Sequence, residues 1–183
     1  MKKILGIVGS PRRNGNTHIA VNRIIDAAKE RGAIGETIFI SDLIIRECDG
    51  CHACWKTGLC AKKDNMNAIF QKIIEADILI FGTPVYWYGP TALMKVFIDR
   101  MVYFNCPENR IKIKGKKAVV VIPYEEENPE TVRPVVEFFE KSLSYLELNI
   151  IKVLTAPGLS ERGEIKDNPE YMDQAAKIGE SLV

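Results

Sequence analysis

Four cysteines within thirteen residues carry the clearest chemical signal in this chain. Cys48, Cys51, Cys54 and Cys60 occur in the segment CDGCHACWKTGLC. Thiolates this closely spaced can share one iron-sulfur cluster, because short loops let several sulfurs converge on it. Zinc fits less well, since structural zinc sites usually take cysteine pairs from separated turns. Reduced thiols with a structural or redox role are the remaining alternative.

The other residues able to bind metal or react as thiols lack a partner motif. Cys106 stands apart, directly before Pro107, and we expect an uninvolved thiol there. For His18 and His52 we expect surface or packing roles, because neither sits in a ligand-like spacing.

A second candidate site follows the first apolar run, in the segment GSPRRNGNT. Two hydroxyls, an amide, a positive charge from Arg12 or Arg13 and the backbone N–H groups of a helix start can hold a phosphate there. Neither G-x-x-x-x-G-K-[ST] nor G-x-G-x-x-G is present, so a monophosphate fits better than a triphosphate or a dinucleotide. The alternative is a turn that only caps the helix. The candidate binding residues are Ser10, Arg12, Asn14, Gly15, Asn16 and Thr17.

A third candidate site places three consecutive aromatic residues in a loop bounded by proline and glycine. Neighbouring side chains of a loop cannot all face one core, so at least one aromatic is expected beside a planar ligand. Covering nearby helix ends is the other reading of these aromatics. The candidate residues are Pro84, Val85, Tyr86, Trp87, Tyr88 and Gly89.

Five apolar, β-branched runs alternate with five amphipathic segments, which predicts an α/β fold with a parallel sheet covered on both faces. The predicted strands are Lys3–Val8, Thr37–Ile40, Ile78–Gly82, Ala118–Ile122 and Ile150–Leu154. The predicted helices are Thr17–Arg31, one from Asp64 or Asn65 through Ile74, one carrying Leu93, Phe97 and Met101, Val135–Leu146, and one starting near Asn168.

Strict alternation favours a doubly wound five-stranded sheet of order 2-1-3-4-5. Ligands of such sheets bind outside the carboxyl ends of strands 1, 3 and 4. The phosphate and aromatic segments follow strands 1 and 3. We expect the cysteine segment at the same edge, because it follows strand 2.

Composition bounds the class of protein. The chain has 183 residues, of which 46% are apolar, and we expect a single domain over residues 1–183 without disulfides. A formal net charge of +1 indicates neither a nucleic-acid nor an anionic-membrane partner, and no segment is typical of a signal peptide or a membrane span. We therefore expect a cytoplasmic protein with reduced thiols and a small-molecule ligand.

Together these segments resemble the flavodoxin-like NAD(P)H-dependent FMN reductase family over about the first 100 residues. The matching segments are Gly9–Arg12 with Gly15–Thr17, the cysteine segment leading into Asp64–Met66, Ala76–Asp77, Thr83–Tyr86, and Leu93–Lys95 with Phe97–Arg100.

The resemblance implies an FMN cofactor and NAD(P)H as co-substrate. Ser10, Arg12, Asn16 and Thr17 would hold the FMN phosphate, while Pro84–Gly89 would cradle the isoalloxazine. No catalytic side chain is implied, since the cofactor carries the hydride chemistry. A homodimer or homotetramer is expected, with a small molecule or a redox protein as electron acceptor. The acidic loop Pro123–Pro129 departs from the family's Gly- or Ser-rich pattern, and a solvated turn is its favoured reading. The alternative is that its glutamates approach the ring, where they would disfavour the anionic reduced form and lower the potential.

Three functions remain open on this basis. The first is an oxidoreductase that passes electrons from NAD(P)H through FMN to a second acceptor. The second is an electron carrier, because Cys48, Cys51, Cys54 and Cys60 also resemble the C-x2-C-x2-C-x4-7-C pattern of archaeal iron-sulfur flavoproteins that bind a [4Fe-4S] cluster, although Trp55–Gly58 resembles members without one. The third is a non-enzymatic module that binds a nucleotide or a metal.

Overall fold

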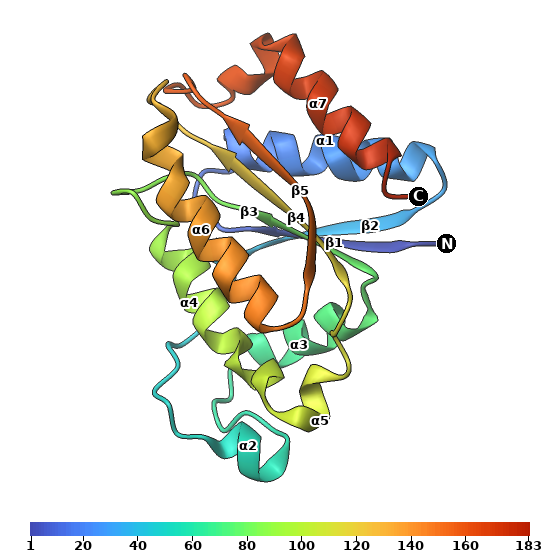
Figure 1. Cartoon of the computed structure of the whole chain (residues 1–183), viewed down its shortest axis with the longest axis vertical. Helices are drawn as coiled ribbons and strands as arrows, with labels where there is room; N and C mark the ends of the chain where they lie inside the picture. Colours follow the sequence, from blue (N-terminus) through green and yellow to red (C-terminus); the bar gives the residue numbers. More distant parts are fainter.

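Five parallel strands form one sheet in the computed structural model, which describes every residue from Met1 to Val183 (Figure 1). The strand order is β2-β1-β3-β4-β5, and each neighbouring pair is parallel. Both the predicted fold class and the predicted order are confirmed. The strands are β1 (Lys3–Val8), β2 (Ile34–Phe39), β3 (Ile78–Gly82), β4 (Lys117–Pro123) and β5 (Asn149–Ala156).

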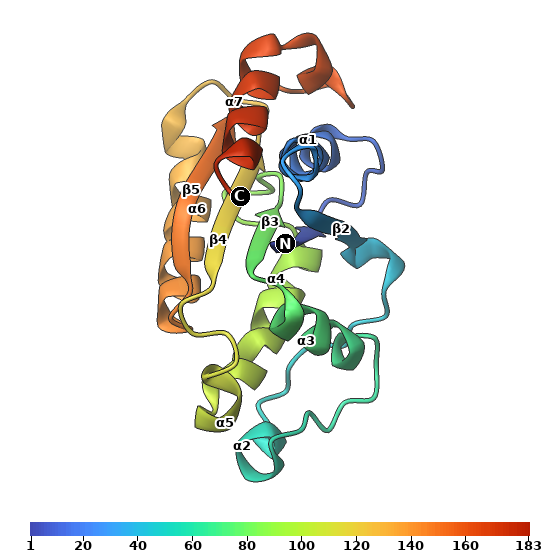
Figure 2. The same cartoon turned by 90° about the vertical axis from the view of Figure 1, so that its right-hand side faces the viewer.

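Helices cover both faces of the sheet (Figures 1 and 2). Successive side chains of a strand point to opposite faces, so each central strand feeds two cores. Leu5 and Ile7 of β1 join a cluster of 28 buried residues, whereas Ile4 and Val8 join one of 19. This double burial explains the near-continuous apolar runs. One face carries α1 (Asn16–Glu30) and α7 (Pro169–Glu180), and the other carries α3 (Met66–Glu75), α4 (Ala92–Arg100) and α6 (Pro129–Tyr145).

Two elements begin at least three residues earlier than their apolar patterns predict. Strand β2 starts at Ile34 rather than Thr37, because Ile34–Glu36 pair with β1 although Ile34 and Glu36 are exposed and so form no apolar run. Helix α6 starts at Pro129 rather than Val135. The Asn128 side chain caps it by accepting a 3.0 Å hydrogen bond from the Glu130 N–H, and Pro134 lies inside the helix despite the usual cost of an interior proline.

Two short helices have no counterpart in the prediction. Helix α2 (Ala53–Thr57) lies within the cysteine segment, and α5 (Pro107–Arg110) follows the turn after α4. Helices of five and four residues are too short to show a helical apolar period. Both views place α2 at the foot of the molecule, away from the sheet (Figures 1 and 2). None of the helices combines the length and apolar character that crossing a bilayer requires.

The carboxyl ends of β1 and β3 are bound tightly together. The Gly9 N–H donates to the Gly82 carbonyl at 2.8 Å, and the Thr91 hydroxyl donates to the Gly9 carbonyl at 2.6 Å. A Cβ on Gly82 would lie 2.8 Å from the Thr17 side chain, so the end of β3 touches the first turn of α1. These contacts fix the loops after β1 and β3 beside each other.

Helices α1 and α7 approach so closely that a glycine is required between them. A Cβ on Gly179 would lie 2.1 Å from the Ile24 carbonyl oxygen, which is backbone and cannot rotate away. We expect Gly179→Ala to lower the free energy of unfolding by about 1–3 kcal/mol through overpacking, even though alanine favours a helix interior by about 1 kcal/mol.

Urea denaturation measures this effect, with Asp173→Ala on the exposed face of α7 as the control. A Gly179→Ala protein as stable as the parent would show that the helices do not meet there.

Candidate functional site

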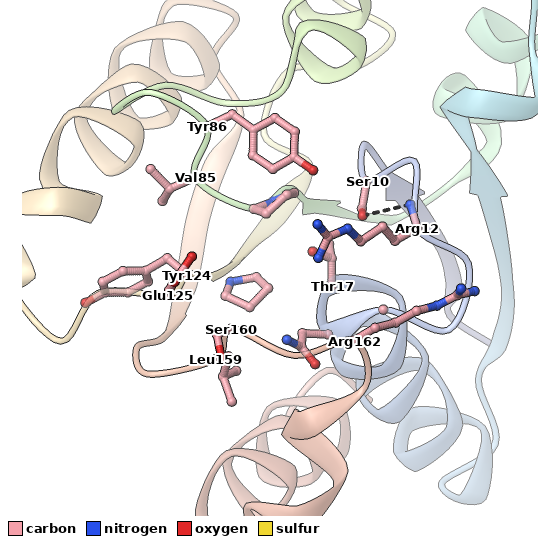
Figure 3. Close-up of a pocket in the computed structure, with 14 residues that line it drawn as sticks. Ser10, Arg12, Thr17, Val85, Tyr86, Tyr124, Glu125, Leu159, Ser160 and Arg162 are labelled. Carbon is pink, nitrogen blue, oxygen red and sulfur yellow. Dashed lines mark hydrogen bonds between the residues drawn. The ribbon is translucent and has the colours of Figure 1, made fainter.

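A cleft of about 140 Å³ opens at the carboxyl edge of the sheet (Figure 3). Loops after four strands contribute to it, as expected for a parallel sheet whose strands all end on one side. Eight of its lining residues belong to the predicted binding set. They are Ser10, Arg12, Gly15, Asn16, Thr17, Pro84, Val85 and Tyr86. Asn14, Trp87, Tyr88 and Gly89 are not among the lining residues.

The first turn of α1 offers the cleft an uncompensated positive end. No side chain caps this helix, and no acidic residue lies in its first turn. Ser10 is 4% exposed and Thr17 is 2% exposed, and both line the cleft. The Ser10 hydroxyl accepts a 3.2 Å hydrogen bond from the Arg12 N–H (Figure 3). Free helix N–H groups with nearby hydroxyls form an arrangement suited to an anion.

The two adjacent arginines have different partners. Arg13 forms an ion pair with Asp42, and its guanidinium lies 4.5 Å from the centre of the Phe39 ring. Arg12 forms no ion pair and lines the cleft (Figure 3). From the sequence, either arginine could supply the positive charge of the site. In the structure Arg13 is paired with Asp42, and of the two only Arg12 is free to meet a ligand's negative charge.

The Asn16 and His18 side chains organise the loop after β1. The Asn16 amide nitrogen donates to the Glu161 carbonyl at 2.9 Å, and its oxygen accepts from the Ile165 N–H at 3.1 Å. His18 Nδ1 accepts from the N–H of Asn14, whose φ is 55°. Burial lowers the pKa of His18, and the charges of Arg13 and Lys166 lower it further. A neutral His18 is therefore favoured, which suits its acceptor role.

The aromatic loop is a tight hairpin. Tyr86 and Gly89 exchange backbone hydrogen bonds of 2.8 and 3.0 Å. The two residues between them both have positive φ, 48° for Trp87 and 59° for Tyr88, as both central residues of a type I′ turn require. Trp87 is 97% exposed at the tip, while the Tyr86 ring overhangs the cleft (Figure 3).

Segments after β4 and β5 supply lining residues that sequence reasoning missed. The acidic turn is exposed at Glu125–Glu127, yet Glu125 lines the cleft and Tyr124 is buried. Arg162 reaches back and donates to the Arg13 carbonyl at 2.8 Å. The ends of β4 and β5 at the common edge were the available signal. The residues not foreseen as a set are Pro123, Tyr124, Glu125, Leu159, Ser160 and Arg162.

The four clustered cysteines line a second cavity, together with Arg100, Val102 and Tyr103. Cys54 is buried, Cys51 is exposed, and Cys48 and Cys60 are half-buried. No three cysteine, histidine or acidic side chains converge as they would around a single metal ion. Cysteine thiolates are the ligand type that iron-sulfur clusters use, so the residues fit such a group in their chemistry.

The two cavities lie at opposite ends of α4. The cleft side holds Thr91, which caps the start of α4, whereas Arg100 at its end lines the cysteine cavity. Nine helical residues span about 13 Å. The expectation that the cysteines hang beside the cleft within one chain is therefore wrong. The segment runs back from the end of β2 and packs against the far end of α4 (Figures 1 and 2).

The chain is similar to known proteins of one family. A family model described as NADPH-dependent FMN reductase matches residues 2–127. An iron-sulfur flavoprotein of Archaeoglobus fulgidus is 34% identical over 122 residues, which are 67% of this chain and 54% of that relative. The chain thus spans about half the length of this relative.

A Bacillus subtilis protein, whose name describes an NAD(P)H-dependent FMN-containing oxidoreductase, is 25% identical over 182 residues. That match covers 96% of each chain. The solved structure of the Trp repressor binding protein from Bacillus subtilis superposes with a TM-score of 0.72 at 22% identity, covering 97% of this chain and 98% of that one. The structural likeness supports the fold.

Arg12 and Arg13 give a matched test of the cleft. We expect Arg12→Gln to weaken FMN binding by about 1.5 kcal/mol, roughly tenfold in Kd, because one charge-assisted contact is lost. Arg13→Gln removes the same charge from a side chain already paired with Asp42 and should change Kd much less. Calorimetric titration with FMN measures both. Equal losses would show that the arginines act only through their long-range charge.

Proposed function

The chain belongs to the NADPH-dependent FMN reductase family, and we propose that it is an FMN-dependent oxidoreductase that takes a hydride from NAD(P)H and passes electrons to a second acceptor. One observation carries the proposal. The uncapped, acid-free start of α1 meets Ser10, Thr17 and the unpaired Arg12 in a cleft at the carboxyl edge of the sheet. This arrangement supports a phosphate-bearing cofactor at that position.

The proposed work of the chain is to bind and orient the cofactor. The hydroxyls of Ser10 and Thr17 would donate to the phosphate, and Arg12 would balance its charge. Pro84, Val85 and Tyr86 form one wall for the ring, and Tyr124 lies across the cleft from them (Figure 3). FMN itself supplies hydride acceptance and electron transfer, so no catalytic side chain is assigned. Glu125 is the one carboxylate on the cleft, and it would disfavour added negative charge on the ring.

We also propose that the protein is a cytoplasmic homodimer or homotetramer. Trp87 and Tyr88 support the oligomer, because an aromatic pair 97% and 61% exposed at a hairpin tip is typical of surfaces that meet another chain. A partner chain seated on the tip would enclose the cleft, whose other walls belong to this chain. The acceptor would be a small molecule or a redox protein that reaches the ring from the open side.

A second candidate function is electron transfer through an iron-sulfur cluster as well as FMN. Its support is that Cys48, Cys51, Cys54 and Cys60 all line one cavity, and that relatives at 34–40% identity are named iron-sulfur flavoproteins. We propose that these thiolates hold a [4Fe-4S] cluster, which exchanges single electrons when bound. Because the cavity and the cleft lie at opposite ends of α4, electrons would pass between them through or around the helix, or between subunits.

The first function predicts that NAD(P)H reduces FMN held by this protein. Under anaerobic conditions, NADPH or NADH should bleach the flavin absorbance of the loaded protein faster than that of free FMN at equal concentration. In the Ser10→Ala/Thr17→Ala double variant, FMN affinity should fall by about 3 kcal/mol or more, roughly 100-fold, because two donors to a dianion are lost.

The bleaching rate per bound FMN should stay the same in that double variant, since neither residue takes part in hydride transfer. A parent protein that retains no FMN after incubation and desalting, and so stays colourless, would instead favour the non-enzymatic module.

The second function predicts a dependence on all four cysteines. After anaerobic reconstitution with iron and sulfide, the parent should bind about four irons per chain, and replacing Cys48, Cys51, Cys54 or Cys60 by serine should abolish binding. Cys106→Ser is the control, because Cys106 does not line the cavity. Iron analysis and electron paramagnetic resonance of the reduced protein measure the outcome. A parent with fewer than about three irons would leave the plain FMN oxidoreductase in place.

A further inference from the structure

Arg100 is a fully buried charge that the FMN cleft does not use. It ends α4, and its side chain is 1% exposed, as is that of its ion-pair partner Asp64. Arginine is almost never this buried unless it is paired. Replacing such a pair by apolar residues is often neutral or stabilising, so stability alone does not explain it.

The hydrogen bonds of Arg100 join three separate parts of the cysteine loop, which we define as residues 46–64. Nη1 donates to the Arg46 carbonyl at 2.8 Å, where the loop leaves the body of the protein. Nη1 and Nη2 donate to the two Asp64 oxygens at 2.6 and 3.1 Å, where the loop returns. Nη2 also donates to the Cys60 sulfur at 3.3 Å. One planar group therefore fixes both ends of the loop and one sulfur within it.

Asp64 also joins the two ends of the loop, which lie side by side at Arg46 and Asp64 and which we call its neck. Its Oδ2 accepts from the Arg46 N–H at 2.9 Å, and its Oδ1 accepts from the Met66 N–H at 3.1 Å. The next residue, Asn65, exchanges two hydrogen bonds with the backbone of Ile44. Lysine could not replace Arg100 here, because an ammonium is a point charge that lacks the rigid fork.

The contact with Cys60 places a positive N–H donor on a sulfur of the cysteine cavity. Hydrogen bonds to the ligating sulfurs and local charge are among the factors that set the reduction potential of iron-sulfur clusters. A donor stabilises the reduced cluster, because reduction adds negative charge to its sulfurs. The Asp64 carboxylate spans the Nη1–Nη2 edge of the guanidinium, and Nη2 also donates to the Cys60 sulfur, so that sulfur contacts the positive group directly.

We propose that Arg100 is the positioning residue of the cysteine cavity: it clamps the neck of the loop and, through its hydrogen bond to Cys60, raises the reduction potential of the cluster held there. This inference rests on the proposed cluster. It assigns a role to a residue outside both the cysteine motif and the FMN cleft.

The potential of the reconstituted protein tests the proposal. Arg100→Lys keeps the charge but loses the fork, and Arg100→Gln/Asp64→Asn replaces the pair by neutral groups of similar shape. Arg110→Lys is the control, because Arg110 pairs with Glu147 and does not line the cysteine cavity. In a redox titration followed by electron paramagnetic resonance, both Arg100 variants should be harder to reduce by at least tenfold, about 59 mV for a one-electron couple. Potentials equal to the control would overturn the role.

Limited trypsin digestion of the metal-free protein gives an independent readout. The loop holds Arg46, Lys56, Lys62 and Lys63 as cleavage sites. Cleavage within residues 46–64 should be several-fold faster in Arg100→Lys than in Arg110→Lys, and equal rates would overturn the clamp. If the parent takes up no iron, the cluster proposal and the potential shift fail together, whereas faster loop cleavage would still support the clamp.

Discussion

All five strands of the sheet run in the same direction, and the position of the cleft depends on this constraint. Each chain segment that leaves a strand does so at one edge, so loops more than 140 residues apart, such as those holding Arg12 and Arg162, meet there. The edge is held by backbone contacts between Gly9 and Gly82 and by the Thr91 hydroxyl. The cleft therefore belongs to the fold itself, and its side chains only determine what it accepts.

Helix α4 separates the cleft from the cysteine cavity. Its start is bound to the loop after β1, beside the cleft, and its end carries the buried Arg100 beneath the cysteine loop. The cysteine loop contains no strand and only the short helix α2, and the hydrogen bonds of Arg100 and Asp64 hold its two ends together. A buried ion pair suits this purpose because its bonds are directional, whereas apolar packing does not dictate the path of a loop.

Neighbouring residues of the same type have different roles in this protein. Arg12 is free while Arg13 pairs with Asp42, and Tyr86 lines the cleft while Trp87 and Tyr88 turn outward. In the first turn of α1, Asn16 and His18 use their polar atoms to join chain segments. Chemical type alone would have ranked these residues equally, because each can in principle contact an anion or a planar ring.

The sequence by itself determined the parallel sheet, its order and most of the residues on the cleft. Doubly buried strands must be continuously apolar, and the tight loop that leads from β1 into α1 needs small, polar residues, so both leave local patterns. It did not determine the start of α6 or the helices α2 and α5, where capping and packing outweigh periodicity.

Only the tertiary structure decided which arginine is free, that Tyr124, Glu125 and Arg162 reach the cleft, and that the cysteines lie at the far end of α4. Each of these depends on a contact between distant segments, such as Arg13 with Asp42 or Arg100 with Cys60. Such pairings follow from where folded segments meet in space, and local sequence patterns carry no record of them.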